Sequence, residues 1–148
     1  MTRAKTAALI AVLALLAVPA VAAAASPTIA MMEKVNAFRH AHGLPSVHLN
    51  GSLEHSARSY AGDMMRTGYF GHQPRIHASR RFRTLGEIIE EHRGLRPNVG
   101  LTFRDWENSP EHRAIMLYGG FNFAGAGFVS GRFNGHRTTI WVMHFGHH

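Results

Sequence analysis

Apolar residues recur at helical spacing in two stretches of the chain after residue 26. The first stripe predicts a helix over 27–42, ended by a glycine and a proline. The second predicts a helix over 50–67, with Asn50 as its N-cap and Gly68 as its stop. The apolar positions are Met31, Val35 and Phe38 in the first helix, and Leu53, Ala57, Tyr60, Ala61 and Met64 in the second.

A third helical stripe leads into a junction that holds candidate functional residues. It consists of Val99, Phe103 and Trp106. Ser109 is a good N-cap for a short helix that follows over 112–118. In the first turn of that helix the unpaired N–H groups disfavour a positive charge, so the imidazole of His112 is expected to stay neutral. A neutral imidazole can bind a metal ion or a proton.

After this helix the apolar pattern changes to that of strands. Two strands are predicted over 121–129 and 140–145. Between them Asn134 and Gly135 form a two-residue hairpin signal, and Gly131 could seat a bulge. Helices first and strands last predict an α+β domain rather than a βαβ repeat.

Residues 1–25 have the layout of a secretory signal peptide. Arg3 and Lys5 form a basic start, 6–21 is an almost unbroken apolar run, and small residues follow. The run is too short and too rich in alanine to favour a retained membrane span, so no transmembrane span is expected after cleavage. The remaining 26–148 has the length of one domain, expected to be a monomer that is secreted to the extracellular space or the periplasm.

Composition narrows the chemistry. The chain has no cysteine, which rules out thiol mechanisms and disulfide support. The formal net charge is +7 when the 12 histidines are counted as neutral. This positive charge favours attraction to anionic wall polymers, lipid head groups or nucleic acid. The cations are spread along the chain without interleaved aromatic residues, so no specific nucleic-acid surface is expected. A solvated basic face is the simple alternative.

Two segments in the middle of the chain supply further candidate residues. In 69–72, two aromatic residues precede a glycine, which suggests a tightly packed loop, and His72 follows directly after it. A loop histidine positioned by packed aromatic residues is a candidate site residue. Glu87 follows a glycine and precedes two apolar residues that would hold it against the core. Glu90 and Glu91 have the pattern of solvated charges.

Six short parts of the chain together resemble the motifs of a known family. They are 35–39 with 43–45, 57–65, 70–72, 86–87, 106–113, and 124–127 with 141–146. In this order they resemble the CAP superfamily, the secreted domains named for cysteine-rich secretory proteins, antigen 5 and pathogenesis-related 1, and in particular its bacterial single-domain branch. The resemblance covers nearly all of 26–148.

The resemblance implies a three-layer α-β-α sandwich with a central antiparallel sheet. It also implies a central cleft lined by His72, His112 and Glu87. Two imidazoles with a carboxylate and open positions would suit a divalent metal such as zinc, with the two histidines as its ligands. The same three residues could alternatively do acid–base work on a water molecule.

This chain departs from the family pattern near the expected cleft. Ile88 and Ile115 stand where the family has asparagines. Ser109, expected to line the cleft, stands where eukaryotic members carry a second glutamate. A set of four acids and histidines is thus reduced to three, which weakens a catalytic interpretation.

Three hypotheses for function remain open. The first is a non-enzymatic extracellular binding domain whose cleft holds a divalent cation, with a lipid, a protein or a cell-envelope polymer as its ligand. The second is a metal-dependent hydrolase of peptide or cell-wall material, with Glu87 as base. The third is a vestigial cleft on a domain that attaches to anionic envelope polymers or lipids through its basic surface. The chain lacks the motifs of common hydrolases, which favours the first hypothesis.

Overall fold

Eight helices and strands are found in the computed structural model, which describes residues 25–148. In chain order they are α1 (Pro27–Ala41), β1 (His48–Leu49), α2 (Gly51–Thr67), β2 (Thr84–Arg93), α3 (Val99–Asn108), α4 (Pro110–Met116), β3 (Phe123–Phe133) and β4 (His136–His147). The predicted signal peptide lies outside the described residues apart from Ala25. Among the described helices, none is long and apolar enough to cross a membrane.

The helices follow the stop and start signals of the sequence. The side-chain oxygen of Asn50 accepts hydrogen bonds from the backbone N–H groups of Ser52 and Leu53, at 3.0 and 3.3 Å, and so caps α2. Gly68 ends the same helix with a left-handed backbone, at a φ of 71°. α4 begins at Pro110, directly after the predicted N-cap Ser109, because proline fits the first helical position, and it ends at Met116 rather than at residue 118.

The sheet has the strand order β1-β3-β4-β2. Strands β3 and β4 form the predicted hairpin, and Asn134 and Gly135 make its turn with φ values of 47° and 84°. The two strands pair residue for residue, so the bulge that Gly131 could have seated is absent. β1 runs parallel to β3, which makes the sheet mixed rather than wholly antiparallel.

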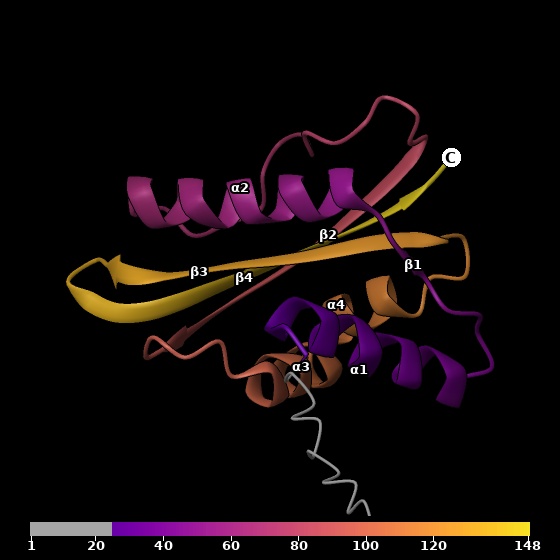
Figure 1. Cartoon of the computed structure of the whole chain (residues 1–148), viewed down its shortest axis with the longest axis horizontal. Helices are drawn as coiled ribbons and strands as arrows, with labels where there is room; N and C mark the ends of the chain where they lie inside the picture. The colour runs from indigo at the N-terminus through magenta and orange to yellow at the C-terminus, as the bar shows by residue number, and fades with distance from the viewer. Residues whose placement is uncertain (1–24) are drawn as a thin grey trace, which may run out of the picture.

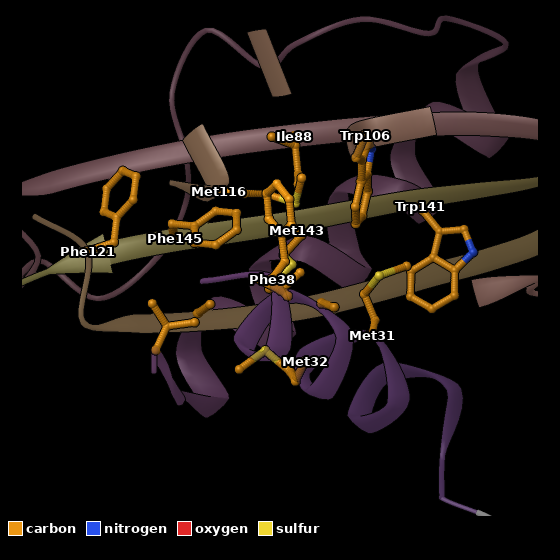
Figure 2. Packing of buried hydrophobic residues seen from close by; sticks show 14 residues of the cluster. Met31, Met32, Phe38, Ile88, Trp106, Met116, Phe121, Trp141, Met143 and Phe145 are labelled. Carbon is orange, nitrogen blue, oxygen red and sulfur yellow. The ribbon is translucent and has the colours of Figure 1, made fainter. Parts of the chain in front are cut away.

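Helices cover both faces of this sheet, which confirms the three-layer architecture. Figure 1 shows α2 on one face and α1, α3 and α4 on the other. Two apolar clusters fill the spaces between the layers. The larger cluster is built around Trp106, Trp141, Met143 and Phe145 and lies between the sheet and the three-helix layer (Figure 2). Burial of these large side chains provides most of the driving force for folding.

Two glycines in β3 let α2 lie directly on the sheet. A Cβ atom at Gly125 would come within 2.2 Å of the backbone nitrogen of Glu54, and one at Gly127 within 2.4 Å of that of Arg58. A side chain at either position would push the helix away, because backbone cannot shift cheaply in a packed layer. These glycines therefore fix the position of α2, and with it the start of the loop that follows.

Arg39 of α1 fastens the segment that follows α4. Its fully buried guanidinium donates to the carbonyl oxygens of four residues, among them Met116 at 2.7 Å and Tyr118 at 3.1 Å. Burial lowers the pKa of Arg39, and the four acceptors offset the cost of removing its charge from water. The end of α4 is thereby held in place.

Candidate histidine and carboxylate site

Glu87 lies on β2, the strand at one edge of the sheet. Its side chain is only 6% exposed, which is unusual for a carboxylate. In the register of the sheet Glu87 is paired with His144 of β4, so both side chains project from the same face. Ile89, two residues further along β2, packs in the apolar cluster beneath α2. Glu87 therefore belongs to the face that α2 covers.

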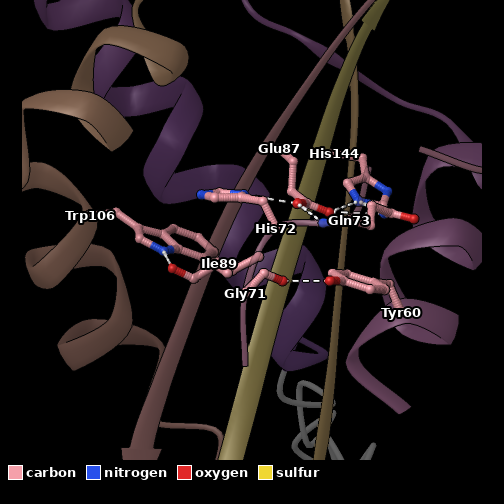
Figure 3. A network of polar contacts seen from close by, with 8 residues as sticks. All are labelled: Tyr60, Gly71, His72, Gln73, Glu87, Ile89, Trp106 and His144. Atoms are coloured by element: carbon pink, nitrogen blue, oxygen red, sulfur yellow. Dashed lines mark hydrogen bonds and ion pairs between the residues drawn. The ribbon is translucent and has the colours of Figure 1, made fainter. Parts of the chain in front are cut away.

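Four hydrogen-bond donors surround the carboxylate of Glu87 (Figure 3). Its Oε1 accepts from Nδ1 of His72 at 2.9 Å and from the backbone N–H of Gln73 at 3.2 Å. Its Oε2 accepts from Nε2 of Gln73 and from Nε2 of His144, both at 2.9 Å. Burial by itself would raise the pKa of Glu87, but the side-chain hydrogen bonds from His144, Gln73 and His72 outweigh it and lower that pKa. Glu87 is thus held as a carboxylate.

The carboxylate determines where the hydrogen atoms of the two neighbouring rings lie. Nε2 of His144 must carry a hydrogen to donate to Glu87. Nδ1 of His144 is buried without a hydrogen-bond partner among the described residues, so it carries the lone pair rather than an unpaired N–H. Nδ1 of His72 likewise donates to Glu87, and in the neutral ring the lone pair is therefore on Nε2.

His72 is delivered to this position by the segment between α2 and β2. The hydroxyl of Tyr60, on α2, donates to the carbonyl oxygen of Gly71, directly before the histidine (Figure 3). Further along, the backbone N–H of Ser79 donates to Oγ of Ser52 at 2.8 Å. The side chain of His72 itself remains 57% exposed. Its Nδ1 is committed to Glu87, while most of the ring stays accessible to solvent.

His112 reaches the same region from the opposite layer. It is the third residue of α4, and α4 packs against β2. Burial lowers the pKa of His112, and the nearby His72 lowers it further. Nδ1 of His112 is buried and has no hydrogen-bond partner among the described residues.

Trp106 joins the three-helix layer to the edge strand beside this site. Its indole N–H donates to the carbonyl oxygen of Ile89 at 3.1 Å, and the side chain is fully buried (Figure 3). α3 is thus tied to β2 two residues beyond Glu87. Ser109 stands at the N-cap of α4, three residues before His112, but its side chain makes no capping hydrogen bond.

The environment of Glu90 differs from the solvated one that the sequence predicted. Successive side chains of a strand point to opposite faces, so Glu90 lies on the face away from Glu87. It is half-buried rather than solvated, and burial together with the neighbouring charge of Asp105 raises its pKa. Glu91 is exposed, as predicted.

Sequence reasoning proposed His72, Glu87 and His112 as candidates and missed Gln73 and His144, which bind the carboxylate of Glu87. A histidine within the apolar run 140–145 was the available signal for His144, since a polar residue in a buried strand needs a partner. Gln73 carries no signal besides its place after His72.

The donors at this site fit a divalent cation held by two imidazoles. The described part of the chain contains no group of three or more histidine, aspartate or glutamate side chains arranged around one metal position. His72 and His112 each keep a ring nitrogen without a described partner, as does the fully buried His144, whereas Glu87 is engaged by four donors. A cation bound by His72 and His112 would keep open positions for another ligand.

Comparisons with known proteins agree with this architecture. The model of the CAP family, described as the cysteine-rich secretory protein family, matches residues 32–145. The YkwD protein of Bacillus subtilis is 28% identical over 124 residues, which are 78% of this chain and 45% of that protein. The chain thus spans less than half the length of this relative.

Solved structures show the same fold. An outer surface protein of Borrelia burgdorferi superposes with a TM-score of 0.68 at 16% identity, over 80% of this chain and 90% of that one. An extracellular protein with an SCP domain from Bacillus anthracis gives a TM-score of 0.66 at 20% identity, over 82% of this chain and 40% of that one. The match of the family model over most of the chain, on a fold that these structures share, shows that the chain belongs to the CAP family of cysteine-rich secretory proteins.

Proposed function

We propose that this chain is an extracellular binding domain in which His72 and His112 hold a divalent cation such as zinc at the edge of the sheet. An extracellular location is supported by two structural relatives, one an outer surface protein and the other an extracellular protein. When bound, the cation would supply a positive charge and open coordination positions for an acidic or carbonyl group of a ligand. The ligand itself is a lipid, a protein or a cell-envelope polymer.

The hydrogen bond between Nδ1 of His72 and Glu87 carries this proposal. A histidine that binds a metal generally donates its other ring N–H to a carboxylate or carbonyl, which fixes the ring and its tautomer. At 2.9 Å, Glu87 has this relation to His72 and leaves the lone pair on Nε2. His144 and Gln73 in turn hold Glu87. Of the two candidate ligands, His72 therefore already has the supporting hydrogen bond that is typical of a histidine bound to a metal.

The same contacts favour binding over hydrolysis. A general base needs a lone pair within reach of a water molecule. Both oxygens of Glu87 already accept two hydrogen bonds each, so this carboxylate is better suited to position His72 than to take up a proton. Ser109, where a second carboxylate would stand in eukaryotic relatives, offers no replacement.

Calorimetric titration of zinc into the metal-free protein tests the proposal. We expect one-to-one binding that is lost in both His72→Ala and His112→Ala. His136→Ala, which removes an exposed histidine beside the hairpin turn, is the matched control and should bind zinc normally. Glu87→Gln should retain binding with an affinity at least about tenfold weaker, because the support of His72 is impaired.

Other results would contradict the proposal. Zinc binding that persists in both histidine variants would place the cation elsewhere, and absence of binding would remove it. Zinc-dependent cleavage of casein or peptidoglycan that disappears in Glu87→Gln would identify a hydrolase. Attachment to anionic polymers that disappears at high salt and is unaffected by His72→Ala would indicate a vestigial cleft.

A further inference from the structure

A pocket lies next to the histidine site, in the segment that joins α2 to β2. Figure 1 shows this segment arching over the N-terminal part of α2 before it enters β2. The pocket is open to solvent and has a volume of about 690 Å³. It is formed by 73–80 together with Phe82 and Leu85. Gln73 belongs both to this pocket and to the hydrogen-bond network of Glu87, so the two sites adjoin.

Cationic side chains without acidic partners line the pocket. Arg75 and Arg80 contribute to its wall together with His77, and no aspartate or glutamate does. The chain has no acidic residue anywhere between Asp63 and Glu87. Within the described residues no arginine of this segment forms an ion pair. Guanidinium groups that are free of carboxylates in this way are available to an oxyanion from outside.

Apolar side chains form another part of the wall, beside the polar Gln73 and Ser79. Phe82 is only 8% exposed, and Ile76 and Leu85 are half-buried. The ring of Phe82 is supported from behind by Phe123, with ring centroids 6.1 Å apart. Such a surface favours a ligand that can bury hydrocarbon, which a simple inorganic anion cannot do.

The backbone of the pocket is fastened at several points. The backbone N–H of Phe82 donates to the carbonyl oxygen of Ser79 at 3.2 Å, and that of Arg83 donates to the carbonyl oxygen of His147 at 2.8 Å. The backbone N–H of Ser79 is bound to Ser52, as described above. These bonds hold the cationic and apolar parts of the wall in a fixed relation before any ligand arrives, which lowers the entropic cost of binding.

We propose that this pocket binds the phosphate group of an amphiphilic ligand. Arg75 and Arg80 contact the phosphate oxygens, and the apolar part of the ligand lies on Phe82, Ile76 and Leu85. A phosphate suits this wall because it offers several oxygens to several planar donors. The site goes beyond the proposed cation site and requires no metal. Its ligand is either a soluble phosphoester or the head group of a membrane lipid, which share this chemistry.

Calorimetric titration with alkyl phosphates in the presence of a chelator tests the pocket independently of zinc. Hexyl phosphate should bind at least about tenfold more tightly than ethyl phosphate or hexanol, because only hexyl phosphate offers both chemistries. The double variant Arg75→Gln/Arg80→Gln should lose about tenfold or more in affinity. Arg96→Gln/Arg104→Gln removes the same charge from exposed positions outside the pocket and should bind hexyl phosphate normally.

The source of the phosphate is distinguished by sedimentation with lipid vesicles. Vesicles of phosphatidylcholine that contain phosphatidylglycerol should carry the protein down, with competition by hexyl phosphate, if the ligand is a lipid head group. Binding of hexyl phosphate without binding to these vesicles would identify a soluble phosphoester. An equal loss of affinity for hexyl phosphate in the two double variants would show that binding results from general attraction by a basic surface. That result would overturn the proposal. Absence of any hexyl phosphate binding would overturn it as well, whatever the zinc titration shows.

Discussion

His72 and His112 reach one region from opposite layers, yet the protein holds their rings in different ways. His72 lies on a loop, and its exposed ring is fixed by a hydrogen bond from Nδ1 to the buried Glu87. His112 lies on a helix, and its Nδ1 is buried without a polar partner in the described chain. A loop backbone is thus combined with a polar anchor on the side chain, and a helical backbone with packing of the side chain alone.

The position of the His112 ring is restrained through the backbone of the helix that carries it, rather than through a hydrogen bond to Nδ1. Arg39 binds the carbonyl oxygen of Met116, the last residue of α4, and that of Tyr118 just beyond it. The ring of His112 is therefore placed without control of its tautomer, whereas Glu87 controls both position and tautomer for His72. The two histidines should accordingly respond differently to substitution.

Replacement of Glu87 should have the largest effect, because it removes the anchor on which the first arrangement depends. Glu87→Ala would leave the N–H of His144 and the amide of Gln73 buried without an acceptor. We expect the free energy of unfolding to fall by about 3 kcal/mol. Urea denaturation of the metal-free protein measures it. Glu91→Ala, an exposed glutamate on the same face of β2, is the control and should change little.

The dependence of this loss on pH provides an internal check. Because the pKa of Glu87 is lowered by folding, its carboxylate contributes stability above the pKa of the unfolded chain. That contribution disappears as the pH falls through the lowered pKa of the folded state. The difference between Glu87→Ala and the parent should therefore shrink in acid. A difference that is the same at neutral and strongly acidic pH would contradict the assignment of Glu87 as an ionised anchor.

Replacement of each histidine by phenylalanine compares the two arrangements directly. His72→Phe removes one donor from a carboxylate and should cost about 1.5 kcal/mol in metal-free buffer. His112→Phe removes a buried nitrogen that has no described partner, so the free energy of unfolding should stay within about 0.5 kcal/mol of the parent. Both variants should lose zinc binding. An equal fall in the free energy of unfolding for the two variants would show that the hydrogen bond to Glu87 does not make His72 more important for stability than His112.

The parts of this protein that could be predicted from sequence depend on neighbours along the chain. Apolar stripes and capping residues located α1, α2 and α3, and Asn134 with Gly135 located the hairpin. β1 escaped prediction because two residues show no pattern, and β2 because charged side chains interrupt its apolar ones. The bulge that Gly131 could have seated did not form, since a glycine permits a bulge without requiring one.

Prediction of the candidate site from sequence was limited in the same way, to features that are local along the chain. Short motifs pointed to His72, Glu87 and His112, but the partners of Glu87 follow from sheet register. Pairing of Glu87 with His144 joins residues 57 positions apart, and no local pattern states it. The burial of Glu90 likewise depends on a helix that packs across β2, with Asp105 as the neighbouring charge. Local sequence thus pointed to candidate groups without the contacts that orient them.

The smallest expected effect concerns the protonation of His112. Burial and the nearby His72 lower its pKa below 6.5, so in mildly acidic solution the unfolded chain takes up a proton there before the folded protein does. The contribution of this group to stability is complete above the unfolded pKa and is lost as the pH falls toward the lowered folded value. Between pH of about 7.5 and 5.5, the parent should therefore lose more stability than His112→Phe, which cannot titrate at this position. Denaturation of both proteins in the presence of a chelator measures the difference, and the other histidines are common to the two. Identical losses would mean that His112 has a polar partner in solution after all, and that its ring is held in the same way as that of His72.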